Sequence, residues 1–151
     1  MAKRFTREEI KQRFQASIDA GQPIVIASAG IGIAAKFAER GGADMIGLFN
    51  SSYLGLGRVE ATSLMPYGNA NDIVMSLGDR IFPVVQNTPI LGGIIGSDPT
   101  REMTPFLKIM QFKGFPAVIN FPSPGFAYGQ HRRNLEPVSY THLTLPTNRE
   151  V

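Results

Sequence analysis

Polar side chains and glycines stand directly after four apolar runs in this sequence, and they are the residues that could do chemistry. The set comprises Ser28, Gly30, Gly32, Asn50, Ser51, Ser52, Ser97, Asp98, Arg101, Asn120 and Ser123. Most members are neutral hydrogen-bonding groups, and the set holds one carboxylate and one guanidinium. Such a combination suits a small, oxygen-rich anion, so the expected ligand is a phosphorylated or carboxylate metabolite.

Asp98 is the strongest single candidate for catalysis. A carboxylate at this position could hold Mg²⁺ through oxygen or act as a general base toward water. It could equally cap the turn that precedes Pro99. Arg101 could grip a phosphate with two parallel hydrogen bonds, or be a solvated charge at the start of a helix. Mg²⁺ is therefore a possible cofactor, with Asp98 as its ligand.

The turn around Gly30 and Gly32 offers a second kind of site. Backbone N–H groups at the start of a helix can bind phosphate or carboxylate. The two glycines could also serve only to make the turn tight. Ala35 occupies the last glycine position of the G-x-G-x-x-G fingerprint, which argues against a nicotinamide dinucleotide site. The sequence contains neither a Ser–His–Asp order nor an H-E-x-x-H pattern.

These residues must be positioned by alternating strands and helices. Apolar runs predict strands over 23–28, 45–50, 90–95 and 117–121. Helical periodicity predicts helices over 7–20, 32–40 and 105–113, and another that begins after Asn69 or Asn71 and contains Ile81. Thr104 is the expected cap of the helix over 105–113, and Pro105 its first residue. The first two strands are nearly all apolar, as strands covered on both faces are.

Local signals refine two of the helices. Thr6 and Glu9 form a capping-box pattern at the start of the leading helix. In the helix over 32–40, we expect Ile33, Ala34, Phe37 and Ala38 to face inward. Glycines 92 and 93 interrupt the third strand, which often marks a close approach of another group to the backbone. The long segment 51–69 is expected to be a functional loop.

Strands that alternate with helices predict an α/β fold with a parallel sheet. Two architectures fit the pattern: a doubly wound sheet, and the first half of a (β/α)₈ barrel preceded by an N-terminal helix. A full barrel takes about 250 residues, so 151 residues with four predicted strands fit half of one.

Composition excludes several classes of protein. The chain has no cysteine, which rules out disulfides and thiolate metal sites and is compatible with a cytoplasmic location. No apolar run approaches 20 residues, so no membrane span is expected. The net charge is +3, and the basic residues are scattered, so nucleic acid is not an expected partner.

The C-terminal segment 138–151 departs from the rest of the chain. Residues 138–147 read VSYTHLTLPT, which resembles one translated frame of a transposase sequencing adapter. We therefore expect a barrel-derived domain over 1–137 and a non-native tail over 138–151, and we leave the tail out of the fold.

Several blocks of the sequence resemble the phosphoenolpyruvate hydrolase-like family. They are RFTREEI, AGIGIAAKFAERGGADMI, FNSS, LMPYGNAND, ILGGIIGSDP and GFPAVINFPSPG, in this order. The resemblance implies a (β/α)₈ barrel, of which this chain covers the N-terminal half, and hydrolysis of phosphoenolpyruvate to pyruvate and phosphate. Related mutases and lyases hold Mg²⁺ with several acids at strand ends, whereas only Asp98 stands at such a position here.

Three functions stay open at this point. The first is an enzyme of phosphoenolpyruvate/pyruvate-type chemistry, with Ser28, Gly30, Gly32, Asn50, Ser51, Arg101 and Asn120 binding substrate and Asp98 acting as base or metal ligand. The second is a non-catalytic barrel that binds a small anion or a partner protein. The third is a related carbon–carbon or phosphorus–carbon lyase or mutase. Because half a barrel leaves two strand edges open, we also expect a homo-oligomer or aggregation.

Overall fold

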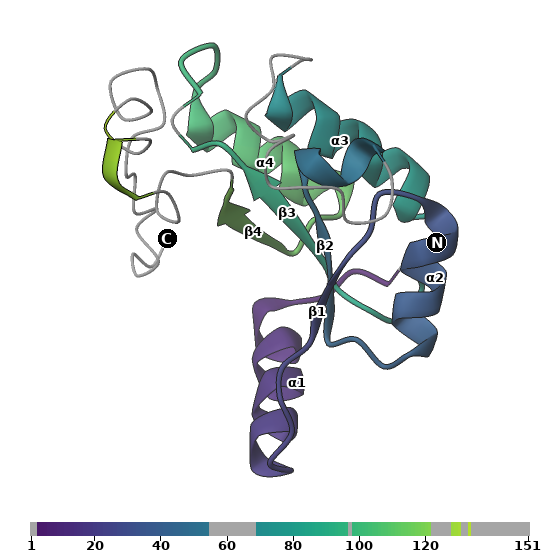
Figure 1. Ribbon diagram of the computed structural model, residues 1–151. Coiled ribbons are helices and arrows are strands. Elements are labelled where there is room, and N and C mark those ends of the chain that lie inside the picture. Colours follow the sequence, from purple (N-terminus) through teal and green to yellow (C-terminus); the bar gives the residue numbers. More distant parts are fainter. Residues whose placement is uncertain (1–2, 55–68, 97, 122–127, 131–132, 134–151) are drawn as a thin grey trace.

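The computed structural model describes residues 3–54, 69–96, 98–121, 128–130 and 133, without the side chains of residues 53 and 54. Its elements are α1 (Arg7–Asp19), β1 (Ile26–Ser28), α2 (Gly32–Arg40), β2 (Met45–Leu48), η1 (Asn50–Leu54), α3 (Ala70–Ile81), β3 (Ile90–Ile94), α4 (Met103–Lys113) and β4 (Ala117–Asn120). The four strands form one parallel sheet in the order β1-β2-β3-β4 (Figure 1). The predicted α/β fold with an N-terminal helix is confirmed and corresponds to half of a barrel.

The two faces of the sheet have different partners. Ile46 pairs in register with Ile90, and both point toward the layer of α2, α3 and α4. This helix-side core is fully buried at its centre, where Val74, Leu77 and Ile81 of α3 meet the strands. Such strands, covered by crossover helices, are expected to be apolar throughout, and β2 and β3 are buried along their whole length.

Helix α1 covers the other face at the amino ends of the strands (Figure 1). Its Ile10 packs with Met45 and Leu91. The helix begins as predicted: the Thr6 hydroxyl accepts from Glu9 N–H at 3.2 Å, and the Glu9 carboxylate accepts from Thr6 N–H at 2.7 Å. The hydrogen bond from the Thr6 backbone, with others from Lys3 and the Thr6 hydroxyl, lowers the pKa of Glu9 to about 2.

The first βα unit differs from its prediction. β1 contains only Ile26–Ser28 and is largely exposed, so it is not covered on both faces. Ala34 and Ala38 pack on the core as predicted, but Ile33 and Phe37 are 61% and 59% exposed. The reason is position: β1 is an edge strand within the described residues, so one flank of β1 and of α2 has no neighbour there.

Several element boundaries also differ. α4 begins at Met103 with Glu102 as its N-cap, two residues before the predicted start. Pro105 is accommodated in the first turn because N–H groups there have no partner within the helix. Asn69 caps α3, accepting from Asn71 and Asp72 N–H groups. β2 ends at Leu48, and the chain turns into the short 3-10 helix η1.

The glycines in the strands make room for aromatic side chains. A Cβ atom at Gly93 would collide with the Phe49 ring, and the same ring lies against Gly47. Phe49 also meets Phe121 edge-on, with ring centroids 4.8 Å apart. At Gly92, on the other face, a Cβ would lie 2.7 Å from Met110 Cε. The predicted close approach at the third strand is confirmed, and the approaching groups are side chains. None of the described helices is long and apolar enough to cross a membrane.

Candidate functional site

The first group of candidate residues gathers where β1 and β2 end. η1 folds back so that Ser52 lies beside β1, and the hydroxyls of Ser28 and Ser52 are 2.7 Å apart. Asn50, at the start of η1, is buried, and Ser51 is half-buried. One hydroxyl of such a pair donates to the other, which leaves one O–H hydrogen for a further acceptor.

Gly30 is required in this group because there is no room for a side chain at its position. A Cβ atom there would overlap the backbone carbonyl of Ser52, so any other residue would push η1 away from β1. Gly32 is tight against Val84, with 3.3 Å between its hypothetical Cβ and Val84 Cγ2. The N-cap residue of α2, Ile31, makes no side-chain hydrogen bond to the first turn. The first N–H groups of α2 therefore lack the side-chain cap that α1 and α3 have.

The second group surrounds Asp98, which follows β3. Its Oδ1 accepts from the Thr100 N–H at 2.9 Å and from the Thr100 hydroxyl at 2.5 Å. Its Oδ2 accepts from the side-chain amides of Asn69 at 3.0 Å and Asn71 at 2.9 Å. Arg101 Nε lies 2.6 Å from the same Oδ2, as a close ion pair whose angle is poor for a hydrogen bond. Both oxygens are thus surrounded by donors.

These contacts keep Asp98 ionised. Burial by itself raises the pKa of a carboxyl group, because it disfavours the charged form. The hydrogen bonds from Thr100, Asn69 and Asn71 outweigh burial here, so the pKa of Asp98 lies well below its ordinary value. The carboxylate therefore links the end of β3 to the start of α3.

Arg101 is held on three sides. It pairs with Asp98, its Nη2 lies 3.2 Å from Asp72 Oδ1, and its guanidinium stands 4.8 Å from the Phe106 ring centroid. The side chain is only 19% exposed. Sequence reasoning placed Asp98 and Arg101 in one site, and the structure brings them into direct contact.

Asn71 is a residue that sequence reasoning missed. It is fully buried, and its amide accepts from Ile95 N–H at 2.8 Å and donates to the Ile95 carbonyl at 3.1 Å and to Asp98. The Asn71 amide thus makes the two hydrogen bonds to the Ile95 backbone that a neighbouring strand would make inside a sheet. Its only sequence signal is the pair of asparagines at the expected helix start, which predicts Asn69 and Asn71 as alternative caps.

Asn120 closes the group on the side of β4. Its side-chain oxygen accepts from Gly96 N–H at 3.0 Å, which ties the end of β4 to the segment after β3. The two groups both lie at the carboxyl ends of the strands, where barrel enzymes carry their active sites. Ser97, Ser123 and residues 55–68 of the predicted loop lie outside the described residues.

The surroundings of Asp98 do not fit Mg²⁺. A cation needs free oxygen lone pairs, whereas each Asp98 oxygen already faces N–H or O–H donors and Arg101 brings a positive charge. Among the described residues, no group of three or more His, Cys, Asp or Glu side chains could hold a metal ion.

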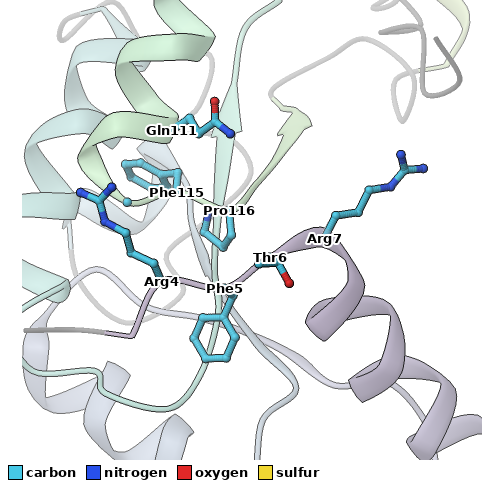
Figure 2. A pocket seen from close by; sticks show the side chains of 8 residues that line it. Arg4, Phe5, Thr6, Arg7, Gln111, Phe115 and Pro116 are labelled. Carbon is cyan, nitrogen blue, oxygen red and sulfur yellow. The ribbon is translucent and has the colours of Figure 1, made fainter. Parts of the chain in front are cut away.

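A pocket of about 410 Å³ lies at the opposite end of the strands (Figure 2). It is bounded by the N-terminal segment, the end of α4 and the residues that lead into β4. The lining residues are Arg4, Phe5, Thr6, Arg7, Gln111, Gly114, Phe115 and Pro116. None of the candidate site residues contributes to it. The amino-end face of a barrel generally serves stability, so we keep this pocket apart from the candidate site.

Comparison with known proteins places the chain among longer relatives. A family model described as phosphoenolpyruvate hydrolase-like matches residues 9–144. The ToMV resistance protein Tm-1(GCR237) of Solanum lycopersicum is 42% identical over 131 residues, which cover 86% of this chain and 17% of that protein. The ToMV susceptible protein tm-1(GCR26) of the same plant is 42% identical over 128 residues, with 84% and 17% covered. The chain thus spans about a sixth of the length of these relatives.

Proposed function

Because this chain belongs to the phosphoenolpyruvate hydrolase-like family, we propose that it supplies four strands of a barrel acting on phosphoenolpyruvate- or pyruvate-type acids. The specific reaction we propose is hydrolysis of phosphoenolpyruvate. Water adds to phosphorus and releases a proton, the bond from phosphorus to the enol oxygen breaks, and the departing enolate takes up that proton at its methylene carbon to become pyruvate. We also propose a cytoplasmic location, with which the absence of cysteine is compatible.

The observation that carries this proposal is the Ser28–Ser52 pair beside the start of α2. One spare O–H hydrogen and the first N–H groups of α2 form a set of donors at the carboxyl end of β1. Hydrogen bonds to a charged group contribute about 1.5–3 kcal/mol each, and a helix N-terminus adds about 0.3–1 kcal/mol for an anion. Two or three such contacts would account for millimolar to micromolar binding of a small anion.

Asp98 and Arg101 have two possible roles in this scheme. As a general base, Asp98 would have to lose one of its donors and accept a proton despite its low pKa. As an anchor, it would position Arg101 and the start of α3. Asp98→Asn separates the two roles. If Asp98 is the general base, the variant stays folded and its kcat falls by about tenfold to a hundredfold or more. If Asp98 is an anchor, the variant has a lower free energy of unfolding.

Ligand binding tests the proposal on this chain. In a ¹⁵N-labelled sample, added phosphoenolpyruvate, pyruvate or inorganic phosphate should shift the amide signals of Gly30, Gly32 and Ile33. The double variant Ser28→Ala/Ser52→Ala should weaken binding by about tenfold or more, the value of one charge-assisted hydrogen bond. Ser76→Ala, on the exposed face of α3, is the matched control.

Turnover tests the specific reaction. Phosphate release from phosphoenolpyruvate should be measured, with and without Mg²⁺, for a longer protein that carries this sequence together with the rest of a barrel. A rate equal to the uncatalysed background in both conditions would exclude hydrolysis. The ligand titration would still report on the binding site.

A non-catalytic barrel that binds a small anion or a partner is the second candidate. The observation in its favour is that both Asp98 oxygens accept from protein donors and that Arg101 is held by Asp98, Asp72 and the Phe106 ring. Two relatives carry names that refer to ToMV resistance and susceptibility, not to a reaction. Stabilisation by an anion without turnover would favour this function. A lyase or mutase reaction would instead appear in a product screen with pyruvate-related acids.

A further inference from the structure

Phe49 joins β2 to η1, and its ring lies on the face of the sheet that Ser28 also occupies. Ser28 pairs in register with Gly47, and residues two apart along a strand share a face, so these three residues point to the same side. Ile46 and Leu48 point to the opposite side, into the helix-side core. The Phe49 ring is therefore a neighbour of the Ser28 hydroxyl.

Two glycines determine where this ring lies. A Cβ atom at Gly47 would lie 2.5 Å from Phe49 Cε2, and one at Gly93 would overlap Phe49 Cδ1. Both contacts are with the edge of the ring, so neither glycine covers a ring face. The ring thus takes the space of two side chains beside Ser28, and the Phe49 side chain is half-buried.

The backbone of Phe49 positions the second hydroxyl of the site. The Phe49 carbonyl accepts from Ser52 N–H at 2.9 Å, and the Ser52 hydroxyl lies 2.7 Å from that of Ser28. One residue therefore holds the hydroxyl pair through its carbonyl and places an apolar ring next to it. All these contacts are made among β1, β2, β3 and η1, so they do not depend on what lies beside the outer strands.

This combination suits a ligand with a charged end and a short apolar end. The spare O–H hydrogen of the Ser28–Ser52 pair can bind an oxyanion. A methyl or methylene group can lie against the Phe49 ring, whereas a hydroxyl there would lose its hydrogen bonds to water without replacement. Neighbouring strands lie about 4.8 Å apart, so an acid of three carbons can contact both Ser28 and the ring.

We propose that Phe49 determines specificity at this site and selects short enol and 2-oxo acids over acids that carry a hydroxyl at the apolar end. The inference rests on the proposed function, because the acid group of the ligand is placed at the Ser28–Ser52 pair. Phosphoenolpyruvate and 2-phosphoglycerate are the matched ligands. Both carry a phosphate and a carboxylate, but 2-phosphoglycerate has a CH₂OH group where phosphoenolpyruvate has its methylene.

Titration of the ¹⁵N-labelled chain measures the selectivity. Phosphoenolpyruvate should bind about tenfold to a hundredfold more tightly than 2-phosphoglycerate, the range in which an apolar surface rejects a hydroxyl. In Phe49→His at about pH 8, the neutral imidazole gives the hydroxyl a partner, so this ratio should fall to about threefold or less. The affinity for inorganic phosphate, which has no apolar end, should change by less than about twofold. Phe112→His is the matched control, because Phe112 is 79% exposed near the end of α4.

A contact measurement on the parent chain needs no variant. Nuclear Overhauser effects should connect the methylene protons of bound phosphoenolpyruvate with the ring protons of Phe49. This measurement decides the role of Phe49 if circular dichroism shows that Phe49→His does not fold.

The outcomes distinguish the role of Phe49 from the existence of the site. If neither phosphate nor phosphoenolpyruvate shifts the amide signals of Gly30 and Gly32, the site is absent and the inference fails with it. If both ligands shift these signals but the ratio is unchanged in Phe49→His, or the ring contacts are missing, the anion site stands and the role of Phe49 is refuted. An equal loss of affinity for phosphate and for both acids in Phe49→His would show that the ring only holds η1 in place.

Discussion

Replacing Asp98 with asparagine gives the sharpest test of the group at the end of β3. The substitution keeps the size of the side chain but turns one acceptor oxygen into an NH₂ donor. If the NH₂ takes the place of Oδ2, it faces the amides of Asn69 and Asn71 and the Arg101 guanidinium. In the place of Oδ1 it faces the Thr100 N–H, while the Thr100 hydroxyl can turn and accept. The second orientation is therefore expected.

The expected cost follows from what this orientation loses. The Thr100 N–H loses its partner, and Arg101 loses its nearest negative charge, although Asp72 still faces it. An unsatisfied buried group costs about 1–3 kcal/mol, and losing one partner of a fully buried ion pair about 3–5 kcal/mol. Because Arg101 keeps a second partner and some exposure, we expect Asp98→Asn to lower the free energy of unfolding by about 2–4 kcal/mol.

The effect should also depend on pH. The folded-state pKa of Asp98 lies below its ordinary value of 3.8, so its charge stabilises the fold above about pH 4, and this contribution is lost as the pH falls further. The difference between the parent chain and Asp98→Asn should therefore be constant from pH 7 to about pH 5 and shrink below about pH 4.

Urea unfolding followed by far-UV circular dichroism measures both effects. Asp79→Asn is the matched control, because Asp79 is 68% exposed and its pair with Lys113 should contribute no more than about 1 kcal/mol. If Asp98→Asn costs no more than the control at pH 7, the carboxylate does not anchor α3 and Arg101. A difference that is the same at pH 3 as at pH 7 would show that the charge of Asp98 has no part in it.

Three further outcomes can be checked on the same chain. Gly93→Ala should destabilise the fold by about 1–3 kcal/mol in urea unfolding, since its methyl group would collide with the Phe49 ring; an unchanged midpoint would show that the ring is not held there. Gly30→Ala should displace Ser52 and abolish the amide shifts caused by anions, and retained shifts would separate the anion site from η1. Carboxyl-detected NMR should find the pKa of Glu9 near 2, so that its stabilising contribution is lost between about pH 4.5 and pH 2; a value near 4.5 would contradict the capping box.

Much of the fold could be predicted because its signals are local. The capping box at Thr6 and Glu9 depends on residues three positions apart, and both residues act as predicted. Strand and helix order also follows from local periodicity, which is why the (β/α) alternation was correct although boundaries moved by one to three residues. The inward pair Ile33 and Phe37 was wrong because periodicity identifies an apolar helix face but not whether a neighbour covers it.

The candidate site could be predicted only in part. The strand-end rule selected Ser28, Asn50, Asp98, Arg101 and Asn120, since in parallel sheets these positions share one edge. Their assigned roles in binding and catalysis stay predictions. Ser52 was in the wider set, but its contact with Ser28 depends on how η1 folds back.

By itself, the sequence determined the order of strands and helices, the caps and the polar character of the strand ends, because each depends on residues that are neighbours along the chain. Tertiary structure decided the rest. Asn71 donates a hydrogen bond to Asp98, which is 27 positions further along the chain. Gly30 is needed because a Cβ atom at this position would overlap the Ser52 carbonyl. Which strands lie at the edges of the described sheet likewise depends on which strand has a neighbour in space. Such contacts come from the closing of loops and the packing of layers, which no local pattern encodes.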